Sequence, residues 1–271
     1  MLFAGPYNNE FGHELFSFQG IARRLSRAHK KTIVCSKPSM KFLYEDFADE
    51  FVATSELTNL SAYEDYTFLS QDNCAVGAGS GLLGVKQEFV KYGKPSDEEY
   101  DIIIHARTKE AIMCPNIDNE IYDLLYRSLS DQYRIAFIGT KAEAYCPPAA
   151  EDLREIKLEK LADILYNSQL VLGHSSGPIH FASLCGATHL TWGGYRPRTF
   201  FRYAHTWNPF KTKCYIFENL DQIGYLKNRA GLFGANQKIF KAKHLNIINE
   251  KNFRVPTLNA LLNGVRKILN E

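Results

Sequence analysis

The stretch that most constrains the fold is residues 169–182, which read QLVLGHSSGPIHFA. Its first four residues form the short apolar run of a buried strand. Gly173 allows a tight turn, and Ser175 or Ser176 can cap a helix that has Pro178 in its first turn. Such a junction presents backbone N–H groups and the positive end of the helix dipole, which suits phosphate. Strand–turn–helix junctions are also common as purely structural features, so the other segments are needed to separate the two interpretations.

Short apolar strands alternate with helices along the rest of the chain, which predicts an α/β fold with parallel sheets. A chain of 271 residues is long enough for two such domains. A glycine-rich segment, 72–97, separates two alternating series and predicts a boundary near residue 95. The predicted strands are 1–6, 31–35, 51–53, 66–69, 100–105, 133–138, 169–172, 188–192 and 214–217, and the predicted helices are 12–28, 39–44, 117–129, 158–167 and 258–269.

Composition excludes several classes of protein. Hydrophobic residues make up 45% of the chain, which is enough for a full core. No apolar run reaches the roughly 18 residues that a membrane span needs, and the N-terminus lacks the features of a secretory signal. The six cysteines are widely spaced without a Cys-x-x-Cys pair, so neither a zinc ribbon nor a disulfide framework is expected. We therefore expect a cytoplasmic protein, of a bacterium or a phage-infected host.

Charge is distributed unevenly along the chain. Residues 1–190 hold 18 Lys and Arg against 26 Asp and Glu, whereas residues 191–271 hold 14 against 4. This asymmetry favours an anionic partner, although a solvated surface or contact with the acidic part would also explain it. Within residues 194–213, basic and aromatic residues alternate, and Arg196, Arg198 and Arg202 are candidates to bind an anionic acceptor. A loop packed by its aromatic residues is the alternative.

Polar residues follow three of the predicted strands. These strand ends carry Arg107-Thr108-Lys109, Gly139-Thr140 and His174-Ser175-Ser176-Gly177. Ligands bind beyond the carboxyl ends of the strands in open α/β sheets, so one nucleotide can span all three ends.

At residues 161–183 the sequence resembles the heptosyltransferase-type family of GT-B glycosyltransferases. In that family an Asp-Ser/Thr-Gly-x-x-His turn follows an apolar strand and holds the phosphates of a nucleotide-sugar. Ser176, Gly177 and His180 match this motif in register, and Ser175 stands where the family usually has Asp. The resemblance implies two Rossmann-like domains facing across a cleft, with a C-terminal helix that returns to the N-terminal domain. The implied parts are an acceptor-side domain at 1–95, a donor-binding domain at 96–255 and the helix at 256–271.

The resemblance also implies roles for single residues. Glu10 matches the acidic catalytic residue before the first helix, with His13 second and Glu14 third as candidates for the base. Arg107 resembles the residue that contacts phosphate, while His174 can line the sugar site. Glu10 is also explained as a first-turn acid favoured by the helix dipole. No Asp-x-Asp sequence occurs, so a metal-independent, inverting transfer is expected, with no cofactor besides a nucleotide-sugar donor, expected to be a UDP-sugar.

The sequence is compatible with more than one class of acceptor. Phage DNA glycosyltransferases, which modify hydroxymethylated cytosine in duplex DNA, belong to the wider resemblance, and such DNA fits the basic C-terminal third. A lipopolysaccharide or other surface glycan is anionic too. A non-catalytic nucleotide- or polyanion-binding module and a sugar epimerase are the competing functions, and either a monomer or a dimer is compatible with the sequence.

Overall fold

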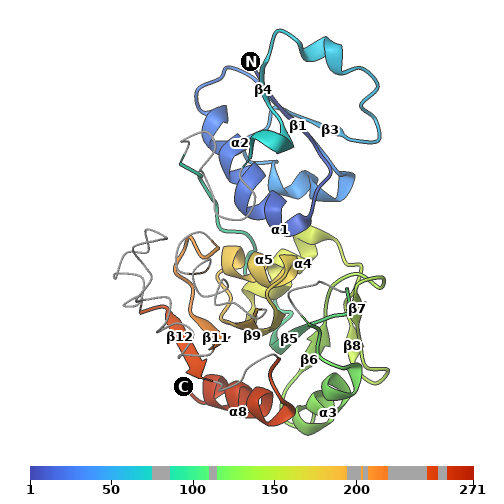
Figure 1. The fold of residues 1–271 in the computed structure, drawn as a ribbon, viewed down its shortest axis with the longest axis vertical. Coiled ribbons are helices and arrows are strands. Elements are labelled where there is room, and N and C mark those ends of the chain that lie inside the picture. The colour runs from blue at the N-terminus through green and yellow to red at the C-terminus, as the bar shows by residue number, and fades with distance from the viewer. Residues whose placement is uncertain (75–85, 110–114, 194–202, 204–206, 219–242, 250–254) are drawn as a thin grey trace. The chain divides into compact units, whose positions relative to one another are not determined.

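A computed structural model describes the chain except residues 75–85, 110–114, 194–202, 204–206, 219–242 and 250–254. The chain divides into two compact units, each drawn in Figure 1. The N-terminal unit comprises Met1–Val90 with Lys157–Glu159, and the C-terminal unit comprises Lys91–Ile156 with Lys160–Glu271. The domain limits expected from the sequence stay predictions.

The N-terminal unit is built on a four-stranded parallel sheet in the order β3-β2-β1-β4. The side chains of β1 and β2 are nearly all buried, as is usual for covered strands of a parallel sheet, whereas Phe68 of β4 is 42% exposed. The chain begins in β1 and places β2 and β3 on one side of it and β4 on the other. The strands are β1 (Leu2–Tyr7), β2 (Thr32–Ser36), β3 (Glu50–Ala53) and β4 (Thr67–Leu69).

The first helical region connects β1 to β2. The sequence predicts one helix over 12–28, whereas the structure has three consecutive segments, α1 (Phe11–His13), a π-helical segment (Glu14–Phe18) and α2 (Gln19–Ser26). The predicted apolar side is nevertheless the buried one, since Leu15, Phe18, Ile21 and Ala22 are at most 1% exposed. Shorter 3-10 helices span Pro38–Leu43, Leu60–Tyr63 and Gln71–Asn73.

The C-terminal unit has a larger parallel sheet in the order β12-β11-β10-β9-β5-β6-β8, and β7 pairs with β5 antiparallel. β5 comes first in the chain but lies between later strands, so the strand order reverses between β5 and β9. The strands are β5 (Tyr100–Arg107), β6 (Ile135–Phe137), β7 (Ala144–Tyr145), β8 (Glu151–Asp152), β9 (Ser168–His174), β10 (His189–Trp192), β11 (Cys214–Glu218) and β12 (Leu245–Asn249).

Four described helices cover this sheet, α3 (Asn119–Leu129), α4 (Leu158–Tyr166), α5 (Gly177–Cys185) and α8 (Leu258–Leu269). Figure 1 shows α3 and α8 on one side of the sheet, with α4 and α5 on the other. No helix among the described residues is long and apolar enough to cross a membrane.

The position of α8 corrects one expectation. The resemblance implies a C-terminal helix that returns to the N-terminal domain, whereas α8 belongs to the C-terminal unit. Its buried side chains, Leu261, Val265 and Ile268, join one apolar cluster with strand residues such as Leu190 and Phe217. α8 lies there because its apolar side is buried against the sheet of the C-terminal unit.

Replacing Leu261 with alanine is expected to destabilise the C-terminal unit by about 2–5 kcal/mol, because it removes a fully buried side chain and leaves a cavity. Both tryptophans, Trp192 and Trp207, lie in this unit, so fluorescence during urea unfolding measures its stability. Arg266→Ala, on the exposed side of α8, is the matched control and should change stability by less than about 0.5 kcal/mol. An unchanged fluorescence midpoint for Leu261→Ala would contradict the packing.

Candidate functional site

The junction of β9 and α5 forms as the sequence predicts. β9 ends at His174, the Ser175 amide donates to the Trp192 carbonyl at 2.8 Å, and α5 starts at Gly177 after the N-cap residue Ser176. The Ser176 side chain makes no capping hydrogen bond to the helix. The N–H groups of the first turn therefore lack the side-chain acceptor that usually satisfies them, and an anion can take its place.

The Ser176 hydroxyl is instead held by a histidine that the sequence analysis did not select. Ser176 Oγ lies 2.9 Å from His105 Nδ1, and His105 is a buried residue near the end of β5. Burial, followed by the effects of the nearby His174 and Arg107, lowers the pKa of His105 to about 3. His105 is therefore neutral at pH 7. Its only signal in the sequence is its place near the end of an apolar strand.

A second histidine holds the other serine. Ser175 Oγ lies 3.1 Å from His180 Nε2, and His180 is buried in α5 with its ring 3.9 Å from that of Trp207. His180, which matches the family motif, thus holds the turn in place through its contact with Ser175. Its predicted contact with phosphate stays a prediction.

Arg107 and His174 meet at the ends of β5 and β9. Arg107 Nη1 lies 3.4 Å from His174 Nδ1, which is also 3.1 Å from the Ser175 carbonyl oxygen. One ring nitrogen cannot accept from the guanidinium and donate to the carbonyl at the same time. Burial, and then the charge of Arg107, lower the pKa of His174 to about 4. Its Nε2 is buried and has no hydrogen-bond partner within the described part of the chain.

The strand order explains why these groups matter together. β5 and β9 are neighbours in parallel register, with His105 opposite Gly173, and the order of strands reverses between them. Ligands of open α/β sheets bind at such a switch point, beyond the carboxyl ends of the strands. Arg107 supplies a fixed cation there, and α5 supplies oriented N–H donors.

The other two predicted strand ends have mainly structural contacts. The Thr108 amide donates to the Glu143 carbonyl at 2.8 Å, and Lys109 Nζ forms an ion pair with the Glu143 carboxylate at 2.8 Å. The Thr140 carbonyl accepts from the Glu143 amide at 3.1 Å. Lys109 is therefore already paired, and its predicted role toward a donor stays a prediction.

Gly139 permits the close approach of this loop to His105. Its φ is +127°, and a Cβ atom there would lie 2.6 Å from Ala144 Cβ and 2.9 Å from His105 Cδ2. A side chain would therefore displace His105, which bonds Ser176. Gly139 thus supports the site through His105.

Glu10 follows the carboxyl end of β1, which lies between β2 and β4 in the sheet of the N-terminal unit. It is the exposed N-cap residue of α1 and makes no side-chain capping bond. Its carbonyl accepts from the Tyr7 hydroxyl at 3.3 Å, and the Asn9 carbonyl accepts from Lys37 Nζ at 2.6 Å. The carboxylate of Glu10 is thus open to solvent on a loop whose backbone is held in place.

The remaining candidate site residues are two possible bases near Glu10 and three arginines predicted to bind the acceptor. His13 is half-buried in α1. Glu14 is fully buried, so it cannot contact an acceptor directly. Arg196, Arg198 and Arg202 lie outside the described residues.

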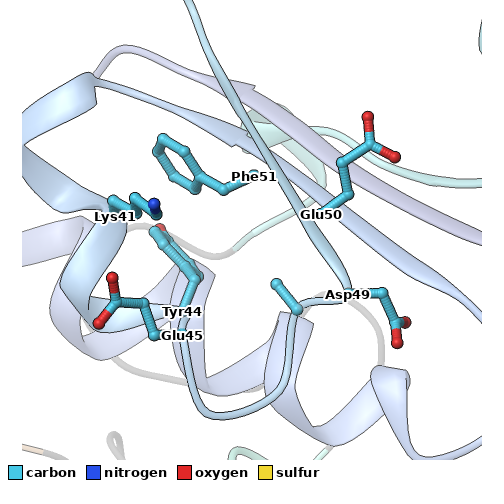
Figure 2. Close-up of a pocket in the computed structure, with 7 residues that line it drawn as sticks. Lys41, Tyr44, Glu45, Asp49, Glu50 and Phe51 are labelled. Carbon is cyan, nitrogen blue, oxygen red and sulfur yellow. The ribbon is translucent and has the colours of Figure 1, made fainter.

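A surface hollow of about 360 Å³ lies elsewhere on the N-terminal unit, and Figure 2 shows its lining side chains. It contains none of the predicted site residues. Of its carboxylates, Glu50 pairs with Lys31 at 3.0 Å and Asp49 accepts from the Thr32 amide at 2.7 Å. This hollow is acidic and its charges serve the fold, so it does not suit a phosphorylated ligand.

The fold matches those of known glycosyltransferases. No protein-family model matches the sequence, and a search of curated proteins finds no match. The structure of a glycosyl transferase family 9 protein from Veillonella parvula DSM 2008 matches with a TM-score of 0.59 at 10% identity, over 99% of this chain and 96% of that one. The heptosyltransferase TibC in complex with ADP-D-beta-D-heptose matches with a TM-score of 0.51 at 15% identity, over 73% and 59% of the two chains.

A second structure of TibC, the iron-containing dodecameric glycosyltransferase from enterotoxigenic E. coli H10407, matches with a TM-score of 0.50 at 13% identity. This chain spans 56% of the length of that protein. Within the described ranges, no group of three or more His, Cys, Asp or Glu side chains could hold a metal ion. The matches confirm the expected fold class, Rossmann-like α/β units of the GT-B type.

Two of the buried histidines, His105 and His174, predict a pH dependence of stability. Because the folded pKa values of His105 and His174 are lowered, the unfolded chain takes up protons first, and stability is lost as pH falls below the ordinary pKa of about 6.5. Each histidine should cost about 1.4 kcal/mol per pH unit between about pH 6 and pH 4. Urea unfolding followed by tryptophan fluorescence at pH 7 and pH 5 measures this loss.

His105→Gln and His174→Gln should each flatten that dependence relative to the unmodified chain. Equal slopes for the variants and the unmodified chain would show that these histidines are not buried in the neutral form.

Proposed function

We propose that this protein is a glycosyltransferase that moves a sugar from a nucleotide-sugar donor to a hydroxyl of an acceptor. The observation that carries the proposal is the meeting of Arg107, His174 and the first turn of α5 at the β5–β9 switch point. A fixed cation next to oriented N–H groups suits the diphosphate of such a donor. The likeness of the fold to a family 9 glycosyl transferase supports the same activity.

Arg107 and the amides of α5 take the role of stabilising the leaving diphosphate. The guanidinium is a cation with several N–H donors, whereas His105 and His174 are neutral at pH 7. Among these neighbouring groups, the positive charge thus comes from Arg107 and the helix dipole. This arrangement can balance the developing negative charge without a metal ion, in line with the expected metal-independent reaction.

Glu10 takes the role of general base. It accepts the proton of the acceptor hydroxyl while that oxygen attacks the anomeric carbon of the sugar. The bond from the anomeric carbon to the phosphate oxygen breaks, and the nucleoside diphosphate leaves with the electron pair. A single displacement of this kind inverts the configuration at the anomeric carbon.

The donor proposed first is an ADP-sugar. TibC is described in complex with ADP-D-beta-D-heptose, and this favours adenine over the uracil expected from the sequence. A thermal-shift screen of ADP-, UDP-, GDP- and CMP-sugars identifies the donor, because a ligand that binds only the folded state raises the melting temperature.

The acceptor proposed first is a hydroxyl of an anionic glycan. The heptosyltransferase among the structural matches favours glycan synthesis over modification of duplex DNA. The excess of Lys and Arg in residues 191–271 suits an anionic glycan and duplex DNA equally well. Binding to duplex DNA that falls steeply with salt, followed by transfer to hydroxymethylated cytosine, would favour DNA instead. An assay of transfer with and without acceptor also separates a transferase from an epimerase or a non-catalytic nucleotide-binding module.

Arg107→Ala is expected to weaken donor binding about 10- to 150-fold, because a charge-assisted hydrogen bond to phosphate contributes about 1.5–3 kcal/mol. Isothermal titration calorimetry with the donor from the screen measures the change. Arg127→Ala removes the same charge from the exposed side of α3 and should leave affinity within about two-fold. Unaltered affinity in Arg107→Ala would reject the phosphate site.

Glu10→Gln is expected to lower kcat about 10²- to 10⁴-fold while donor affinity stays the same, because the amide keeps the shape of the side chain but cannot accept the proton. Steady-state transfer assays and donor titration measure the two quantities. Glu64→Gln, an exposed carboxylate of the same unit, is the control. Normal turnover in Glu10→Gln would exclude Glu10 as the base and leave His13 as the next candidate.

A further inference from the structure

Glu14 is a buried carboxylate that the reaction described above does not use. It lies in the π-helical segment Glu14–Phe18 and is fully buried. Its Oε1 accepts hydrogen bonds from the hydroxyls of Ser36 and of Tyr44, the latter at 2.6 Å. Its Oε2 has no partner among the residues that the structure describes. π-Helical turns inside longer helices occur frequently at functional sites.

The burial of this carboxylate works against the fold at neutral pH. Desolvation raises the pKa of Glu14 to about 6, even though Ser36, Tyr44 and the charge of Lys37 favour the ionised form. The group is therefore mainly ionised at pH 7, in a place where ionisation is unfavourable. Buried charges with shifted pKa values gather at functional sites, because there the charge or its hydrogen bonds have a use other than stability.

The contacts of Glu14 lead to the loop that carries Glu10. The Glu14 amide donates to the Glu10 carbonyl at 3.1 Å, and the Tyr7 hydroxyl donates to the same oxygen at 3.3 Å. Ser36, which bonds the Glu14 carboxylate, immediately precedes Lys37, whose ammonium donates to the Asn9 carbonyl. The end of β2 and the first helix are thus joined to each other through Ser36 and Glu14, and they also hold the carbonyl groups of Asn9 and Glu10.

We propose that Glu14, Ser36 and Tyr44 form a positioning network that holds the Glu10 loop in the geometry needed for proton transfer. Glu14 does not contact the acceptor; it acts through Glu10, and the inference therefore rests on the proposed role of Glu10 as base. A base that is misplaced by about 1 Å can cost a hundredfold in rate, so the network is expected to affect kcat and to leave donor binding unchanged.

The test compares Glu14→Gln and Tyr44→Phe with Tyr63→Phe, which removes a tyrosine hydroxyl from the same unit outside this network. Rates are measured at temperatures where circular dichroism shows each variant fully folded. Glu14→Gln and Tyr44→Phe should lower kcat about 10- to 100-fold, with the KM for donor and the donor affinity within about two-fold. Tyr63→Phe should keep kcat within two-fold. Should Glu14→Gln fail to fold, Tyr44→Phe and Ser36→Ala, which each remove one donor to its carboxylate, carry the test.

A double-variant cycle separates positioning from a merely structural role. Because Glu14 acts through Glu10, Glu10→Gln combined with Tyr44→Phe should be no slower than Glu10→Gln alone. The positioning role would be rejected if the double variant lost the product of the two single losses in kcat. It would also be rejected if folded Glu14→Gln and Tyr44→Phe kept a normal kcat. Normal turnover in Glu10→Gln would instead overturn the role of Glu10 in the proposed function, so the two failures give different results.

Discussion

The parallel pairing of β5 with β9 is the constraint on which the candidate donor site depends. These strands are far apart in sequence, yet their register sets His105 opposite Gly173 and brings their carboxyl ends together. Arg107 then reaches His174, and Ser176 reaches His105. A shift of one residue would turn every side chain to the other face of the sheet and separate all four groups.

Buried histidines are the second element of this site. His105, His174 and His180 are buried around the two serines, and they fix the turn through their ring nitrogens. Because burial keeps His105 and His174 neutral, they add hydrogen-bonding groups without adding a charge that would titrate near pH 7. The charge toward a bound anion is left to Arg107. This division gives the site a fixed geometry and a constant charge over the neutral pH range.

The two units share one feature of strand order, and a residue of opposite charge is associated with it in each unit. In each one, the first strand of the unit lies inside its sheet, and a charged residue stands at its carboxyl end or shortly after it. Arg107 ends β5 in the C-terminal unit, and Glu10 follows β1 in the N-terminal unit. A cation and a carboxylate in equivalent places fit the two needs of glycosyl transfer, which are a stabilised leaving group and a base.

Hydrophobic periodicity was sufficient to predict most of the strands and helices. It indicated β5, β9 and α5 within a few residues, because their apolar runs and their turn residues agree. It did not indicate β7, β8 or β12, which are short or lack a clear apolar run. It also treated the first helix as continuous, since the π-helical segment preserves the buried apolar side.

The resemblance to heptosyltransferase-type enzymes selected Arg107 and Glu10 as candidates. The sequence by itself determined the fold class and the strand–turn–helix at Gly173–Gly177. These features depend on local propensities and on residue types, which can be read along the chain. Only the tertiary structure decided the strand order, the location of α8, the pairing of Lys109 with Glu143 and the side-chain contacts of His105 and Glu14. Each of these depends on contacts between residues distant in sequence. A single sequence carries no direct signal for such contacts, because burial and register arise only when the chain packs.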